Sequence, residues 1–284
     1  MNRICIIINP AARGARARLR RLEGLAREAV IKTTGAPGDA EAQAERAVEQ
    51  GYETIVAAGG DGTINEVVNG IGLAPVTLGI LPMGTVNVFA LEMGIPFNLE
   101  RAWKVIREHH VRAIDLANAN GHLFVQMAGV GLDAQIVQRN SRHVKHMLGP
   151  LSYLLTATQV AAEKPPRLYV SAEGRSTVEG SFVLVGNGRF YGGPFSLFNE
   201  AHLQDGLLDV CVFKSMNYLA LIRYFRGALF GSLSKFSDVH YFKARRLLVK
   251  ANQTVPLEAD GELAGYSPVE FSIRRRRLRV LVPR

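Results

Sequence analysis

The sequence predicts two parts of different fold class, an α/β domain with a mostly parallel sheet and a β-rich, sandwich-like domain. The first hundred residues alternate short apolar runs with segments of helical periodicity, as βαβ units do. After about His110, short strand-like runs dominate. No Ser/Pro-rich linker separates the two textures, so we expect adjoining domains over residues 1–110 and 111–284, with a cleft between them. We also expect the last strand to pack back on the first domain.

In the first domain, apolar runs and helical patterns follow one another. The expected strands are Arg3–Ile8, Ala29–Thr33, Thr54–Ala58 and Val76–Pro82. The expected helices are Ala15–Glu28, Gly38–Gln50, a segment through Ile64–Ile71, one within Gly84–Gly94, and Leu99–Glu108. Parallel strands joined by helices have right-handed connections, and ligands bind at the carboxyl ends of such strands.

In the second domain we expect many short strands and two helical stretches. The expected strands are Ala113–Ala117, His122–Met127, Arg167–Ala172, Thr177–Val185, Leu207–Phe213, Arg246–Lys250, Val255–Glu258, Val269–Ile273 and Leu278–Val282. The helical stretches lie near Pro150–Ala162 and Tyr218–Phe230. This pattern is typical of an antiparallel sandwich.

The composition narrows the class of protein. In a chain of 284 residues with 48% hydrophobic residues, a sizeable core is expected and disorder is not. No apolar run is long enough to span a membrane, and the first residues lack the pattern of a signal peptide. Cys5 and Cys211 lie in strand-like runs without metal-type spacing. We therefore expect buried, reduced thiols in a cytoplasmic protein.

The net charge of +9 is concentrated in two arginine clusters, Arg13–Leu22 and Ile273–Val280. No nucleic-acid-binding motif accompanies them, and aromatic residues are not interleaved with the arginines, so we expect no nucleic-acid partner. Clustered Lys and Arg can bind an anionic membrane surface, contributing about 1 kcal/mol each. A face that is only solvated explains the clusters equally well.

Three polar turns directly follow predicted strands: NPAARG, GGDGT and PMGTVN. The second turn contains Gly59, Gly60 and Gly62, which we expect to take positive φ and to bring backbone N–H groups close to a guest. A helix N-terminus after such a turn favours an anion. The pattern predicts a phosphate-binding turn, and a purely structural strand–helix turn is the alternative. All three turns should open at the same edge of a parallel sheet.

Other motifs leave alternatives open. There is no Walker A pattern, and GVGLDA at Gly129–Ala134 imitates a dinucleotide fingerprint outside any βαβ unit. Asp205-Gly206 precedes a strand and is typical of a turn. Asp260 and Glu262 flank Gly261, so their carboxylates could serve general-base or metal chemistry. An exposed hairpin turn accounts for the same residues.

Taken together, these segments resemble the diacylglycerol kinase catalytic-domain family, in its bacterial soluble branch, whose fold is similar to NAD kinases and sphingosine kinases. The resemblance covers nearly the whole chain in order. It is carried by IINPAARG, GGDGTINEVVNGI, LGILPMGTVNVFALEMGIP, AGVGLDA, NGRFYGGPF, LQDGLLDV and ADGE. The most specific of these is GGDGTINEVVNGI.

The resemblance implies an ATP-dependent, Mg²⁺-dependent lipid kinase that phosphorylates a hydroxyl of diacylglycerol or a related lipid at an anionic membrane surface. It implies that the nucleotide is bound by Asn9, Thr34, Gly59, Gly60, Asp61, Gly62, Thr63, Asn65, Gly84, Thr85 and Asn87, with Asp61 also near Mg²⁺. It implies a structural Mg²⁺ site formed by Asp205 and by the carbonyls of His202 and Leu207. Asp260 would be the catalytic base, with Glu262 beside it.

Two residues depart from the family pattern. Val88 stands where many members have Asp, and Asn199 stands where many have Pro. The first departure removes any role of that acid, and the second puts the detail of the metal segment in doubt. Two other functions stay open at this point: a NAD kinase, which also has a GGDG turn, and an inactive nucleotide- or lipid-binding regulator. The sequence does not define the oligomeric state.

Overall fold

The computed structural model describes residues 3–10, 15–132, 134–135, 165–191, 193, 195–229 and 233–284. The chain divides into two compact units. The first unit comprises residues 1–116, 192–194 and 274–284, and the second comprises residues 117–191 and 195–273. The boundary falls inside two strands, β5 (Val111–Ala119) and β18 (Val269–Leu281).

A parallel sheet forms the centre of the first unit. Its strand order is β2 (Val30–Thr33), β1 (Ile4–Ile8), β3 (Thr54–Gly59) and β4 (Thr77–Pro82), and Arg279 and Val280 of β18 pair in parallel with β4. Every residue of β3 and β4 is buried. Such runs form strands because helices cover both faces of a parallel sheet.

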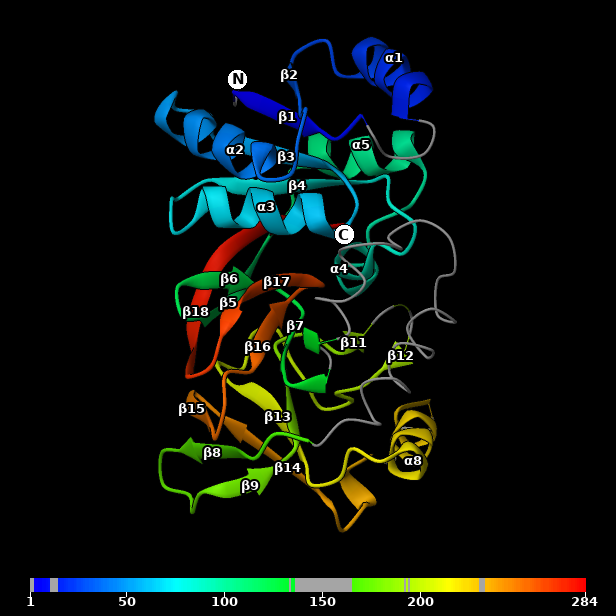
Figure 1. Cartoon of the computed structure of the whole chain (residues 1–284). Helices are drawn as coiled ribbons and strands as arrows, with labels where there is room; N and C mark the ends of the chain where they lie inside the picture. The colour runs from blue at the N-terminus through cyan, green and yellow to red at the C-terminus, as the bar shows by residue number, and fades with distance from the viewer. Residues whose placement is uncertain are drawn as a thin grey trace. The chain divides into compact units, whose positions relative to one another are not determined.

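Five helices of the described first unit flank this sheet: α1 (Ala15–Leu25), α2 (Asp39–Glu49), α3 (Asp61–Ile71), α4 (Val88–Glu92) and α5 (Leu99–Glu108). Figure 1 shows α2 and α3 on one face of the sheet and α1 and α5 on the other. For α1, α2 and α3 this follows from right-handed connections between parallel strands, because the chain reverses its direction across the sheet after β2.

An antiparallel sheet of six strands forms one layer of the second unit. Its order is β14 (Val239–Ala244), β13 (Leu208–Phe213), β10 (Phe182–Gly186), β7 (Met127–Val130), β16 (Pro256–Ala259) and β17 (Glu262–Tyr266). Every adjacent pair is antiparallel.

Further strands of the second unit are β6 (His122–Phe124), β8 (Leu168–Ala172), β9 (Val178–Gly180) and β15 (Arg246–Ala251), with the first residues of β18, and the short pair β11 (Phe190–Tyr191) and β12 (Phe195–Ser196). Alternate residues of β13 join different cores. Leu208, Val210 and Val212 pack with Val170 and Phe271, which belong to the second layer. The sheet therefore has one face in a sandwich core.

The other face of the six-stranded sheet is covered by α8 (Tyr218–Leu229) and the short helix η1 (Leu233–Lys235). Phe182 and Phe213 stack with their ring centroids 4.3 Å apart, and the Tyr224 ring of α8 lies 4.9 Å from that of Phe213. Aromatic packing thus anchors α8 on the sheet.

The predicted fold class is confirmed, whereas several element boundaries were wrong. The predicted strands Val269–Ile273 and Leu278–Val282 form one strand, which includes the exposed arginines between them. Thr177–Val185 contains two strands, β9 and β10. The strands β14 and β17 were not predicted, because half-buried residues interrupt their apolar pattern. The predicted helix near Pro150–Ala162 lies outside the described residues.

Within the described part of the chain, the helices are too short or too polar to cross a bilayer.

Candidate functional site

The predicted turns of the first unit follow strands that end level with one another. Ile8 of β1 pairs with Thr33 and with Ala58, and Ala58 pairs with Leu81. Asn9 and Thr34 continue this pairing, since their N–H groups donate to Ala58 and Ile8 carbonyls at 3.1 and 2.9 Å. The expectation that these turns open at one edge of the sheet is therefore confirmed.

Two of these turns approach each other with backbone against backbone. A Cβ atom placed on Gly84 would lie 2.5 Å from the Cα of Gly60, and one on Gly60 would lie 3.3 Å from the Cα of Gly84. No side chain fits at the closer of these distances. Glycine is therefore required at Gly84 because the two turns touch.

Side chains fasten the same two turns together. The Asp61 carboxylate accepts a hydrogen bond from the Phe89 N–H of α4 at 3.3 Å. Asn87, in the left-handed conformation at φ 55°, accepts from the Gly84 N–H and donates to the Gly84 carbonyl, both at 2.9 Å. Asn87 therefore shapes the second turn from within, and Asp61 holds it against the first.

The expectation of positive φ in the GGDG turn was wrong. Gly59 ends β3, Gly60 caps α3 with φ −90°, and Gly62 lies inside α3. Gly59 instead makes room for the Thr63 side chain, whose Cβ would lie 2.5 Å from a Cβ at that position. The turn is tight because neighbouring groups pack closely.

The remaining predicted nucleotide residues differ in exposure. Thr34, Thr63 and Asn65 are buried, and Thr85 is exposed in the second turn. Asn65 accepts hydrogen bonds from the Asn69 amide through its carbonyl and side-chain oxygens, at 3.0 and 3.2 Å. Thr34 and Thr85 lie in turns at the carboxyl edge, whereas Asn65 lies within α3.

In the second unit, Asp260 and Gly261 form the two-residue turn of the β16–β17 hairpin, with φ 48° and 86°. The Asp260 carboxylate faces the start of β7 and accepts three backbone hydrogen bonds, from Val125 at 2.8 Å, Gln126 at 2.9 Å and Met127 at 3.1 Å. The hairpin itself is confirmed, but Asp260 and Glu262 are half-buried rather than exposed, and the Asp260 carboxylate is held in one orientation.

Polar side chains surround this turn, and the buried Glu258 carboxylate accepts from its Gly261 N–H at 2.9 Å. His122 lies near Asp260 and the half-buried Glu262; burial lowers the pKa of His122, although both carboxylates act to raise it. Gln126 is only 5% exposed, and its side-chain amide has no hydrogen-bond partner in the described structure. Sequence reasoning missed His122 and Gln126, because neither belongs to a motif; only a strand-pairing prediction could have placed them beside Asp260.

The predicted metal segment lies at the same end of the six-stranded sheet, three strands from Asp260. Asp209 pairs with Gly186, Gly186 with Met127, and Ala128 with Ala259. Strand spacing places β13 and β16 roughly 14 Å apart. Asp205 and Asp260 thus belong to different turns at this end of the sheet.

A lysine ammonium lies against the predicted metal segment. Lys243 donates to the Glu200 carbonyl at 2.6 Å and to Asp205 at 3.2 Å, and its ammonium lies 3.6 Å from Asp209. The other Asp205 oxygen accepts from the Leu207 N–H at 2.9 Å, and the exposed His202 offers a carbonyl that already accepts from Asp205.

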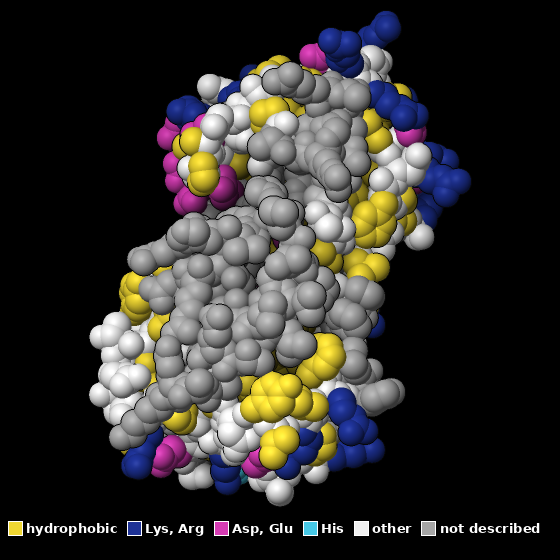
Figure 2. All heavy atoms as spheres, turned by 45° about the vertical axis from the view of Figure 1, so that its right-hand side comes forward, with side chains coloured by type: hydrophobic (Ala, Val, Ile, Leu, Met, Phe, Trp, Pro, Cys, Tyr) yellow, Lys and Arg dark blue, Asp and Glu magenta, His cyan; other side chains and the backbone are white. Residues whose placement is uncertain are grey.

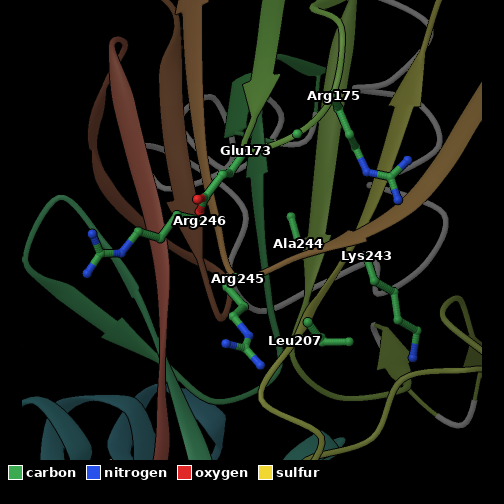
Figure 3. A pocket seen from close by; sticks show the side chains of 8 residues that line it. Glu173, Arg175, Leu207, Lys243, Ala244, Arg245 and Arg246 are labelled. Carbon is green, nitrogen blue, oxygen red and sulfur yellow. The ribbon is translucent and has the colours of Figure 1, made fainter.

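The surroundings of Asp205 contain further charged groups. Asp209 is fully buried and accepts from the Tyr241 hydroxyl, and burial raises its pKa. A cavity of about 530 Å³ beside Leu207 is lined by Glu173 and by the basic side chains of Arg175, Lys243, Arg245 and Arg246 (Figure 3). The cation beside Asp205 in this structure is thus the Lys243 ammonium, and the Mg²⁺ ion that the resemblance predicts at His202, Asp205 and Leu207 would have to displace it. Among the described residues, no group of His, Cys, Asp and Glu side chains could hold a metal.

Comparisons with known proteins agree with this architecture. Residues 3–119 match the diacylglycerol kinase catalytic domain, and residues 126–282 match the YegS C-terminal NAD kinase beta sandwich-like domain. A diacylglycerol kinase of Bacillus subtilis is 33% identical over 94% of this chain and 89% of its own length. One of Staphylococcus saprophyticus is 31% identical, over 93% and 88%.

Solved structures show the same fold. A diacylglycerol kinase from Bacillus anthracis has a TM-score of 0.78 and 25% identity, over 99% of this chain and 97% of its own. An NAD kinase from Archaeoglobus fulgidus in complex with ATP has a TM-score of 0.57 and 12% identity, which shows the fold alone. The fold is of the NAD kinase-like class. Within that class, the chain belongs to the diacylglycerol kinase family of lipid kinases.

Proposed function

We propose that this lipid kinase transfers the γ-phosphate of ATP to a hydroxyl of diacylglycerol or a closely related lipid. The observation that supports this most is the backbone contact between Gly60 and Gly84 at the carboxyl edge of the parallel sheet, in a chain 33% identical to a diacylglycerol kinase. The contact aligns two turns in which phosphates can bind.

On the nucleotide side, the first turn of α3 supplies backbone N–H groups that have no acceptor within the helix. Gly59, Gly60, Gly62 and Thr63 surround these groups, and Asn9, Thr34, Asn65, Gly84, Thr85 and Asn87 complete the candidate nucleotide site. Asp61 would help to hold the Mg²⁺ that accompanies ATP, and the ion would offset charge on the phosphates.

On the lipid side, Asp260 is the candidate general base and Glu262 lies beside it. The Asp260 carboxylate takes the proton of the lipid hydroxyl while the hydroxyl oxygen bonds to the γ-phosphorus. The bond from that phosphorus to the bridging oxygen of ADP breaks, and ADP leaves. Phosphoryl transfer depends mainly on such positioning, and three backbone donors fix the Asp260 carboxylate.

A basic surface is the candidate contact with the membrane that contains the lipid. Arg20, Arg21 and the run Arg274–Arg277 are exposed. Arg21 pairs with Glu100. The others can attract anionic headgroups over roughly 8–10 Å at physiological salt. This supports peripheral binding at an anionic bilayer.

The experiment is a transfer assay with ATP labelled in the γ-phosphate. The acceptors are 1,2-diacylglycerol, ceramide, monoacylglycerol and NAD, and the products are separated by head group. Label in phosphatidic acid supports the proposal, and label in NADP would overturn it in favour of a NAD kinase. Nucleotide binding without transfer to any acceptor would favour an inactive regulator.

A further inference from the structure

The outer side of α8 in the second unit exposes hydrophobic residues that the proposed function does not use. Four large hydrophobic residues on this helix are exposed: Tyr218 at 54%, Leu219 at 77%, Ile222 at 40% and Phe225 at 58%. Its inner side is apolar as well, since Ala220 and Tyr224 pack into the core of the second unit. A helix that is apolar on both sides is normally covered on both.

The exposed residues lie on one face of the helix. Tyr218, Ile222 and Phe225 are spaced i, i+4 and i+7, so their side chains follow one line along α8. Leu219 lies beside this line. The helix is fixed beneath it, because the hydroxyl of Tyr224 donates to Asp238 at 2.5 Å and Gly227 lies close to Phe236. The line is therefore held outward by the fold.

The charges around α8 are basic. The helix contains Arg223 and Arg226 and no acidic residue, and exposed Lys214 and Lys235 lie just before it and just after it in the chain. Arg223 pairs with Asp238, whereas Arg226 follows Leu219 by seven residues and shares its exposed side. In the lower part of Figure 2, the region that α8 occupies, hydrophobic side chains stand next to Lys and Arg side chains.

We propose that α8 inserts its outer face into an anionic phospholipid bilayer. An apolar line flanked by Arg and Lys is the pattern of a helix that lies in the membrane interface, with the apolar side among acyl chains and the cations among phosphates. This rests on the proposed function, because diacylglycerol remains within a bilayer. Surface arginines alone provide attraction that salt removes, whereas α8 adds a hydrophobic contact that salt does not weaken.

The test places a fluorescent reporter on the helix of the full chain. The native protein has a single tryptophan, Trp103, which is buried. Phe225→Trp adds a reporter on α8, and Leu73→Trp adds one at another exposed leucine, in the first unit. When vesicles of phosphatidylcholine and phosphatidylglycerol are added, the tryptophan emission of the Phe225→Trp variant should shift to shorter wavelength. Brominated acyl chains should quench this emission. Leu73→Trp should do neither. Unchanged Phe225→Trp emission would overturn the proposal.

A second variant tests whether the contact contributes to binding. Leu219→Ser with Phe225→Ser should lower vesicle binding at least tenfold at high and at low salt, while Leu73→Ser binds as wild type does. Equal binding by the double variant would overturn the proposal. Sedimentation without lipid gives a third result: a wild-type dimer that becomes a monomer in the double variant would show that a second copy of the chain covers α8, which also contradicts insertion.

Phosphate transfer by the wild type to a short-chain diacylglycerol, dispersed as monomers, reports separately on the proposed function. If that transfer fails while Phe225→Trp inserts, the proposed reaction is wrong and the membrane contact stands. If transfer succeeds and Phe225→Trp does not insert, the reaction stands and the role of α8 is wrong.

Discussion

Asp260 has both a structural role and a candidate catalytic role. Its carboxylate joins the β16–β17 turn to residues 125–127 through three hydrogen bonds, and it is also the candidate base. Asp260→Asn replaces one accepting oxygen by an NH₂ group that faces a backbone donor. An unsatisfied buried donor costs about 1–3 kcal/mol. We therefore expect a lower thermal midpoint for this variant even if it took no part in the reaction, so rates must be compared well below that midpoint.

Lys243 gives a prediction about metal removal. Its ammonium donates to the Glu200 carbonyl and to Asp205, and it lies close to Asp209. We therefore expect a chelator such as EDTA to leave the thermal midpoint of the nucleotide-free protein unchanged. Lys243→Met should lower the free energy of unfolding by about 1.5–3 kcal/mol, the range for a hydrogen bond to a charged group. Lys250→Met, at an exposed lysine of β15, is the matched control. If EDTA lowers the thermal midpoint, and if Lys243→Met is as stable as Lys250→Met, the result would support a bound metal ion at this segment.

His122 gives a prediction about pH. Burial lowers its pKa from the ordinary value of 6.5, so the folded protein binds fewer protons at this ring than the unfolded chain does, just below pH 6.5. Stability contributed by the neutral ring is therefore present above pH 6.5 and is lost as the pH falls toward the folded pKa. His122→Gln should show a smaller fall of the thermal midpoint between about pH 7 and about pH 5 than wild type. An equal fall of the thermal midpoint in His122→Gln and in wild type would contradict this account of the His122 ring.

At the scale of elements, the contact between the two turns predicts unequal costs for two similar substitutions. Gly84→Ala places a methyl group 2.5 Å from the Gly60 Cα, whereas Gly60→Ala places one 3.3 Å from the Gly84 Cα. Forcing a group into a packed site costs typically about 1–3 kcal/mol. We expect Gly84→Ala to weaken ATP binding and stability more than Gly60→Ala. Gly24→Ala, where a methyl group meets nothing within 4 Å, should be neutral or stabilising. Isothermal titration and thermal melts check this order, and equal effects at Gly84 and Gly24 would contradict it.

Apolar patterns in the sequence locate the fully buried strands but not the boundaries of a strand that contains exposed residues. Runs such as Thr54–Gly59 are buried on both faces, so their apolar composition alone locates them. β18 was predicted as two strands, because Arg274–Arg277 interrupt the apolar pattern. The interruption is local: Arg276 has φ 50°, and its N–H donates to the buried Asp115 carboxylate at 2.7 Å. Nothing in the arginine run itself indicates a partner 161 residues earlier in the chain.

At the scale of the whole molecule, the fold class and the residues of the turns could be predicted from sequence, whereas their contacts could not. The alternation of strands and helices places Asn9, Thr34, Gly60 and Gly84 at one sheet edge, which follows from topology. Asn87 bonds to the backbone of Gly84, and Lys243 donates to Asp205. Both roles depend on the three-dimensional neighbours of these residues. The resemblance predicts a metal site at Asp205 from that segment alone, and it does not include the facing strand β14, from which Lys243 projects.

The central claim is that this chain phosphorylates a diacylglycerol hydroxyl with Asp260 as the base. The most direct measurement is the initial rate of labelled-phosphate transfer to 1,2-diacylglycerol in mixed micelles, for wild type and Asp260→Asn at a temperature where both are folded. We predict transfer by the wild type and a rate lower by about 10²–10⁴-fold in the variant, the usual contribution of a general base. ATP affinity should be equal in the two proteins, because the candidate nucleotide turns belong to the other unit. Full transfer by folded Asp260→Asn, or none by the wild type, would contradict the account.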